Sequence, residues 1–130
     1  MPRDTSGVDY QDKFQAVADV VLAESWVLEV APFDTGAAFR LDVVITERHP
    51  DYSAARPGEV YSYRKGWLRL FSDSGAELAL SGARPARDAS GEEDLGHIDS
   101  FDAVGGDWWE LQGDWGLLRV RQPTVELVLD

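Results

Sequence analysis

Apolar residues recur at every second position over most of this 130-residue sequence. The clearest run lies between residues 39 and 46, where apolar residues alternate with mostly polar neighbours: Phe39, Leu41, Val43 and Ile45. Successive side chains of a β-strand point to opposite faces, so this period predicts a strand with one face buried. The sequence therefore predicts a fold built mainly from antiparallel strands.

Residues typical of tight turns separate the alternating runs. Gly, Asp, Ser or Pro supplies the backbone geometry of a turn at positions 34–36, 65–66, 72–75, 105–107, 113–114 and 122–123. These turns divide the chain after Ser25 into a meander of seven or eight short strands. Because a sheet with so many strands usually curls or closes, we expect one strongly curved antiparallel sheet or a partial barrel.

A different period precedes the strands. From Val8 to Glu24, apolar residues recur at three- and four-residue steps, which predicts an amphipathic helix with the stripe Tyr10, Phe14, Val17, Ala18, Val21 and Leu22. A helix of this length is marginal in isolation, so we expect it to pack on the sheet and cover its open end or concave face. The predicted fold class is therefore α+β, and residues 1–7 are expected to form a disordered or extended tail.

The length and composition indicate one soluble domain spanning residues 1–130. The absence of cysteine excludes disulfides, thiolate zinc sites and cysteine nucleophiles. No apolar run approaches the roughly 20 residues needed to cross a bilayer. The N-terminal residues also lack the apolar core of a secretory signal. We therefore expect a cytoplasmic protein that does not act at a membrane.

Charge is distributed unevenly along the chain. The 24 acidic and 12 basic residues give a formal net charge of −12. Residues 56–87 carry six basic and three acidic residues, whereas residues 88–114 carry nine acidic residues and no Lys or Arg. The overall field repels phosphates, so nucleic-acid binding is disfavoured. We expect the basic segment to pair with the acidic one within the fold, and the remaining acidic surface to attract a basic protein, although solubility alone also explains a negative charge.

Residues 82–96 form the one long polar connection, which predicts a mobile acidic loop. Carboxylates in this loop, followed by His97 and Asp99, do not have the spacing of a known Ca²⁺ loop. His49, the other histidine, is distant in the sequence. No nucleophile motif or glycine-rich phosphate cradle is present either. We therefore predict no metal site, no cofactor and no catalytic residue, and the sequence favours a protein that is not an enzyme.

Trp108 and Trp109 are adjacent, so in one strand they must point to opposite faces. An indole left exposed beside carboxylates is a typical interface anchor. The favoured hypothesis is a non-enzymatic interaction protein, for example an immunity-type inhibitor, that presents an acidic face to a basic partner. The predicted face comprises Glu92, Glu93, Asp94, Asp99, Asp102, Asp107, Trp108, Trp109 and Asp114.

The alternative hypothesis is a small-molecule-binding protein or cavity enzyme. A curved sheet capped by a helix can enclose a pocket lined by aromatic and titratable side chains. The predicted lining residues are Tyr61, Tyr63, Trp67, His97 and Trp115. A third interpretation is a domain that acts only within a homo-oligomer, a state that the sequence does not determine.

Overall fold

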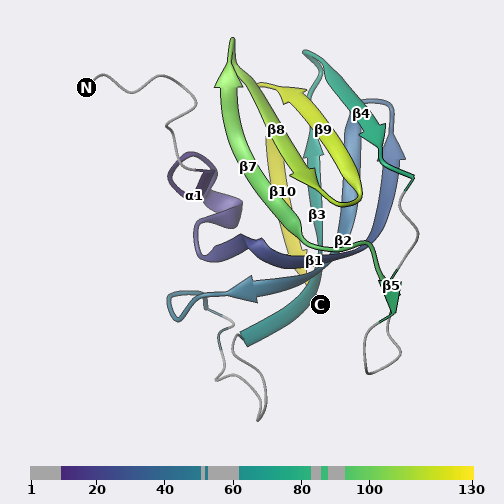
Figure 1. Cartoon of the computed structure of the whole chain (residues 1–130). Coiled ribbons are helices and arrows are strands. Elements are labelled where there is room, and N and C mark those ends of the chain that lie inside the picture. The colour runs from purple at the N-terminus through teal and green to yellow at the C-terminus, as the bar shows by residue number, and fades with distance from the viewer. Residues whose placement is uncertain (1–9, 51, 53–61, 83–85, 88–92) are drawn as a thin grey trace.

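The computed structural model describes residues 10–50, 52, 62–82, 86–87 and 93–130. Over these ranges the chain is mostly β-strand, with one short α-helix and one 3₁₀ turn (Figure 1). In chain order the elements are α1 (Tyr10–Lys13), η2 (Gln15–Val17), β1 (Val20–Phe33), β2 (Gly36–Ile45), β3 (Ser62–Phe71), β4 (Ala76–Leu80), β5 (Ala86–Arg87), β6 (Glu93–Asp94), β7 (Ile98–Gly105), β8 (Trp108–Gly113), β9 (Gly116–Arg121) and β10 (Thr124–Leu129).

The long strands form two antiparallel sheets. The first sheet has the order β1-β2-β3-β10, and the second has the order β4-β9-β8-β7. Figure 1 shows the second sheet, in teal, green and yellow, in front of the first. The predicted antiparallel pairing is thus confirmed, whereas the meander within one curved sheet or partial barrel is wrong. The strands divide into two sheets that do not close, and β3 pairs with β10 and β4 with β9, which are distant in the chain.

Strand β1 explains why the sheet divides. It is 14 residues long and shifts register against β2 between Val21 and Trp26 and again between Val27 and Glu29. Such irregularities bend a strand. At the bend, the Val27 N–H donates to the Gly96 carbonyl at 2.9 Å, and the Leu95 N–H donates to the Val27 carbonyl at 2.7 Å. The main chain of β1 is therefore bonded to β2 and also to the segment that leads into β7.

The hydrophobic core lies between the two sheets. The alternating residues of β2 point inward as expected, and Phe39, Leu41 and Val43 are fully buried. From the second sheet, Leu111 of β8 and Leu118 of β9 are equally buried. Side chains from both sheets belong to one continuous cluster, so a single core stabilises the sandwich.

The predicted helix over Val8–Glu24 is wrong. Helix α1 ends at Lys13, η2 is one 3₁₀ turn, and Val20 already pairs with Ile45 in the first sheet. Val20 and Leu22 also satisfy a period of two, and both are fully buried in β1. β-branched residues fit a strand better than a helix, and pairing with β2 satisfies main-chain groups that a marginal helix would have had to satisfy alone.

The short helical segment still packs against the second sheet. Phe14 lies 5.6 Å from Phe101 of β7 and 4.8 Å from Trp109 of β8, measured between ring centroids. Tyr10 ties the segment to β1, because its hydroxyl donates to the Val20 carbonyl at 3.2 Å and accepts from the Leu22 N–H at 2.9 Å. These contacts fix the helical segment against the side of β7 that faces the core.

The turn predicted at Lys65 and Gly66 is also wrong. Strand β3 continues through both residues, because β2 pairs with it on one side and β10 on the other. A Cβ at Gly66 would lie 2.6 Å from the Val128 carbonyl oxygen. Glycine is therefore required here for the close approach of β10. A turn is present at residues 72–75 as predicted, but it is not a hairpin, because β3 and β4 belong to different sheets and do not pair.

Two predicted segments lie wholly or partly outside the described residues. Residues 1–7, expected to form a tail, are outside them, as is most of the segment 83–92. Within the predicted loop at 82–96, the structure describes β5 and β6, which pair as a two-stranded ribbon.

Removal of a core side chain from the second sheet will destabilise the whole sandwich. We expect Leu111→Ala to lower the free energy of unfolding by about 2–5 kcal/mol, because a fully buried leucine leaves a cavity. The matched control is Leu80→Ala in β4, where the side chain is 56% exposed and the expected change is below about 0.5 kcal/mol. Urea unfolding of the two variants measures both, and equal losses would contradict the described core.

Candidate functional site

Trp108 and Trp109 begin β8 and point to opposite faces, as the sequence predicted. Trp109 is 5% exposed and packs in the core against Phe14 and Phe101. Trp108 is half-buried on the outer face of the second sheet. The Arg119 guanidinium lies 5.1 Å from the Trp108 ring centroid, a cation–π contact that holds the indole against the sheet.

A row of charged side chains crosses the outer face beside Trp108. Asp102 of β7 lies directly opposite Glu110 of β8, which lies opposite Arg119 of β9. The Arg119 side chain pairs with Glu110 at 3.0 Å and with Glu77 of β4 at 3.7 Å. Asp102 is exposed and forms no ion pair with any residue that the structure describes. Asp102 and Glu110 thus form a cross-strand pair of like charges. Arg119 neutralises Glu110, whereas no described cation pairs with Asp102.

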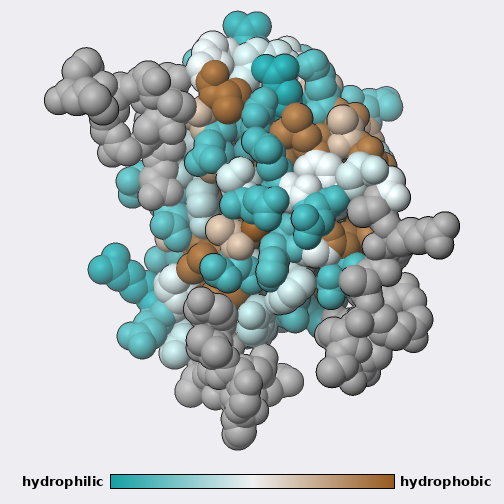
Figure 2. All heavy atoms as spheres, in the orientation of Figure 1, coloured by the Kyte–Doolittle hydropathy of each residue, from teal (hydrophilic) through white to brown (hydrophobic). Residues whose placement is uncertain are grey.

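We call the surface formed by Asp102, Trp108, Glu110 and Arg119 the β8 face. Figure 2 views the molecule from the same side as Figure 1, with the second sheet in front, and shows mainly hydrophilic atoms with separate hydrophobic patches. The sequence did not single out Glu110 or Arg119. Glu110 lies two residues after Trp108, and Arg119 lies two residues before Arg121, so the period of two places each pair on one face. That Glu110 and Arg119 face each other depends on the strand register, which the sequence does not give.

The other predicted acidic residues do not gather on the β8 face. Asp107 lies in the turn between β7 and β8, whereas Asp114 lies in the turn at the other end of β8. Asp94 is buried and accepts a local hydrogen bond from the Gly96 N–H at 2.9 Å. Asp99 is exposed at the start of β7. Glu93 belongs to β6, and Glu92 lies outside the described ranges.

A pocket of about 400 Å³ opens between α1, the β7–β8 turn and the β9–β10 turn. Its floor is apolar, with Phe14, Trp109 and the buried Ala103, together with Pro123. Its polar lining residues, Lys13, Asp107 and Gln122, are exposed and form the rim, and Trp108 also lines it. The sequence did not predict this site, because it joins three segments that are distant along the chain.

Two turns at the rim of the pocket are locked together. The Gln122 N–H donates to the Asp107 carbonyl at 2.7 Å, and the Gln122 side-chain amide donates to the Asp107 carboxylate at 3.3 Å. Both residues have a positive φ, 67° at Asp107 and 48° at Gln122. Non-glycine residues rarely adopt this conformation, so the surrounding contacts must hold it in place.

The residues of the predicted aromatic cavity do not line one space. Trp115 is 3% exposed in the core, where its ring lies 4.8 Å from Phe39. His97 packs against Trp26, with ring centroids 3.8 Å apart and planes inclined by 42°. Trp67 lies on the outer face of the first sheet, 5.8 Å from the Arg40 guanidinium. Tyr63 precedes Trp67 by four residues on β3, and Tyr61 lies outside the described ranges.

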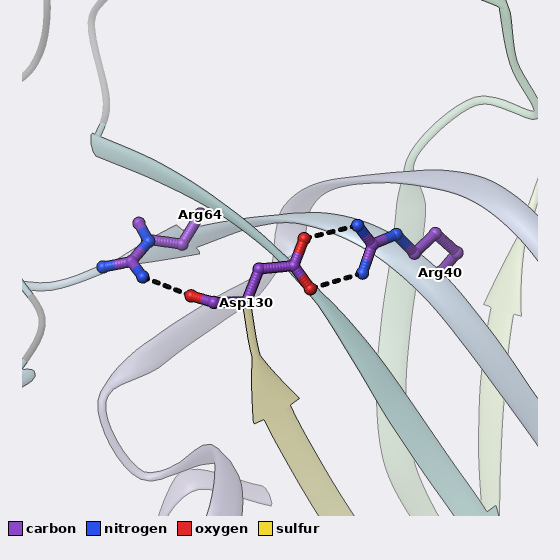
Figure 3. Close-up of polar contacts among 3 residues, drawn as sticks. All are labelled: Arg40, Arg64 and Asp130. Atoms are coloured by element: carbon purple, nitrogen blue, oxygen red, sulfur yellow. Dashed lines mark hydrogen bonds and ion pairs between the residues drawn. The ribbon is translucent and has the colours of Figure 1, made fainter.

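Three arginines of the first sheet bind oxygen acceptors within the fold. Two hydrogen bonds of 2.8 and 2.5 Å join the Arg40 guanidinium to the Asp130 carboxylate, and Arg64 donates to the Asp130 main-chain oxygen at 2.6 Å (Figure 3). Arg69, from the basic middle of the chain, pairs with Glu126 of β10 at 2.8 Å. The expected pairing of this basic residue with the acidic segment is therefore wrong, because β10 brings Glu126 opposite Arg69.

Comparison of the chain with protein-family models, with curated proteins and with solved structures finds no match. None of the helices that the structure describes has the length and apolarity needed to span a membrane. Within the same residues, no three His, Asp or Glu side chains converge as a metal site would require. The candidate site is therefore defined by its geometry alone, as the β8 face and the adjoining pocket.

The Arg40–Asp130 pair will make stability depend on pH in the acidic range. Hydrogen bonds from Arg40, reinforced by its positive charge, lower the pKa of the Asp130 carboxyl below its usual range, about 3.9. A lowered pKa means that the pair stabilises the fold at neutral pH and loses its effect as the pH falls through that lowered pKa. We expect Asp130→Asn to be less stable than the parent chain at pH 7 and equally stable in strong acid. Urea unfolding across pH tests this, and a difference that persists in strong acid would contradict it.

Proposed function

We propose that this chain is a non-enzymatic interaction protein whose β8 face binds a basic protein partner. The observation that carries the proposal is the uncompensated Asp102 directly opposite Glu110. Like charges opposite each other on neighbouring strands destabilise a sheet, whereas opposite charges stabilise it. A cationic side chain from a partner supplies the compensation that Asp102 lacks among the described residues.

Trp108 supplies an apolar anchor at the same place. The indole is already partly buried against Arg119 and against Gly75, where a Cβ would lie 3.2 Å from the ring. A rigid aromatic side chain that is fixed before binding loses little conformational entropy on association. Tryptophan is also enriched among the residues that dominate binding energy at protein interfaces. Trp108 and Asp102 together thus combine an anchor with a charge.

The net charge supports the same partner class. A protein with a formal charge of −12 accelerates its encounter with a basic partner through long-range attraction. An inhibitor of the immunity type, which blocks a basic protein by covering its active surface, is one concrete form of this function. The alternative cavity function has less support, because His97, Trp67 and Trp115 occupy three different environments.

A capture experiment followed by kinetics tests the proposed function. Proteins retained by the immobilised chain at low salt are identified, and the association rate of each basic candidate is measured by surface plasmon resonance at increasing ionic strength. We expect the association rate constant to fall at least about tenfold between low and high salt, as electrostatic steering requires. An association rate that is indifferent to salt would contradict the proposal.

Three variants locate the binding surface. Asp102→Asn should slow association with the partner severalfold, and Trp108→Ala should accelerate dissociation by a factor of about 30, the equivalent of roughly 2 kcal/mol. The matched control is Glu29→Gln, which removes one exposed carboxylate from the first sheet. Equal effects of Asp102→Asn and Glu29→Gln would place the partner elsewhere.

The substitution Asp102→Asn will also stabilise the protein in the absence of its partner. We expect Asp102→Asn to raise the free energy of unfolding by about 0.2–1 kcal/mol, because it removes the repulsion with Glu110. Since the effect is electrostatic and exposed, it should shrink at about 1 M salt, where charges are screened within about 3 Å. Urea unfolding at low and high salt measures it, and a destabilised Asp102→Asn would show that the carboxylate supports the fold.

A further inference from the structure

The pocket beside the β8 face carries two opposite charges that do not neutralise each other. Lys13 of α1 and Asp107 of the β7–β8 turn both line it, and neither forms an ion pair within the described ranges. The Lys13 ammonium therefore does not occupy the Asp107 carboxylate. Asp107 is thus an available carboxylate at the rim of an apolar hollow.

The shape of this hollow suits one long side chain. Phe14 and Trp109 meet edge to face at the floor, with ring centroids 4.8 Å apart and planes inclined by 71°. Pro123 and Ala103 complete an apolar wall. A volume of about 400 Å³ is at the small end of the range for ligand pockets, which begins near 300 Å³. A single side chain with an apolar stem and a polar end fits within such a space.

The carboxylate of Asp107 is positioned before any ligand arrives. The Gln122 N–H holds the Asp107 main chain by donating to its carbonyl, and the Gln122 side-chain amide donates to the carboxylate through a long bond of 3.3 Å. A carboxylate accepts several hydrogen bonds, so this contact leaves acceptor sites on both oxygens. A group fixed in this way binds its partner without a further loss of conformational freedom.

We propose that this pocket receives an arginine side chain of the basic partner. The inference rests on the proposed function and names the group that the partner inserts. The guanidinium binds the Asp107 carboxylate through paired hydrogen bonds, and the aliphatic stem packs on Phe14 and Pro123. Arginine fits better than lysine, because its planar fork matches a carboxylate and stacks on aromatic rings such as Trp109.

Lys13 sets the direction from which the arginine enters. Lys13 of α1 repels an incoming guanidinium, so we expect the side chain to approach from the β7–β8 turn, away from α1. That side adjoins Asp102 and Trp108 on the β8 face, since Trp108 also lines the pocket. One partner surface can therefore contact the β8 face and the pocket together.

Nuclear magnetic resonance with a defined small probe tests the inference without the partner. The probe is Nα-acetyl-arginine amide, and its neutral isostere, Nα-acetyl-citrulline amide, is the matched ligand control. We expect the arginine probe, at millimolar concentrations, to shift the Gln122 side-chain amide and the Trp109 indole N–H signals saturably. The citrulline probe should bind at least about tenfold more weakly, because its neutral ureido group forms no charge-assisted hydrogen bonds with the Asp107 carboxylate.

Three variants decide which charges matter. Asp107→Asn should weaken arginine binding at least about tenfold, and it should preserve the turn because asparagine tolerates a positive φ. Asp114→Asn, the same change in the turn at the other end of β8, should have no effect. Lys13→Gln should strengthen binding about two- to threefold, as removal of one nearby like charge in water predicts.

Equal binding of the citrulline and arginine probes would overturn the inference, and so would equal effects of Asp107→Asn and Asp114→Asn. Weaker arginine binding by Lys13→Gln would also overturn it, because that result would indicate a pocket for an anionic or zwitterionic ligand. The absence of any shift at tens of millimolar would overturn it as well. The proposed function would survive each of these results if partner association still depended on salt and on Asp102. It would fail separately if that dependence were absent.

Discussion

Strand β1 shares its main-chain hydrogen bonds between two sheets, and the position of the candidate site follows from this sharing. Along most of its length β1 pairs with β2, while Val27 exchanges two hydrogen bonds with Leu95 and Gly96 just before β7. Buried main-chain groups must be satisfied, so these bonds fix one end of β7 against the first sheet. The other end of β7 is free to carry a hairpin turn, and the space between this turn, α1 and the β9–β10 turn is the pocket. The same hydrogen bonds between β1 and the segment before β7 hold the second sheet over the first, so that the β8 face lies on the outside of the sandwich.

The two outer faces use charge in opposite ways. On the first sheet, Arg40 and Arg69 are matched by Asp130 and Glu126, so their charges are satisfied within the fold. On the second sheet, Arg119 forms ion pairs with two carboxylates, Glu77 and Glu110, whereas Asp102 forms no ion pair with a described residue. Exposed ion pairs contribute little stability, about 0–1 kcal/mol each, so neither arrangement determines the fold. The difference matters for recognition, because an uncompensated carboxylate beside Trp108 attracts a cation, whereas a bidentate pair such as Arg40–Asp130 does not.

Much of the strand architecture and little of the site was predictable from the sequence. The period of two correctly assigned the inward residues of β2 and the opposite orientations of Trp108 and Trp109. The helix predicted over Val8–Glu24 misassigned Val20 and Leu22. Leu22 satisfies both the helical period and the period of two, and the pairing of β1 with β2 decided between them. Glu110, Lys13 and Gln122 were missed for a related reason. Their importance arises from neighbours on other strands and turns, and strand register and turn packing are not local properties of the sequence.

The sequence by itself determined that this chain forms antiparallel strands with a negative net charge, because side-chain alternation, turn residues and the count of carboxylates are local or additive properties. Only the tertiary structure decided that the strands form two sheets, that Asp102 lies opposite Glu110, and that Asp107 and Gln122 meet at the rim of a pocket. Each of these depends on contacts between residues far apart in the chain. Such contacts form where the bend in β1 and the shared core bring them together.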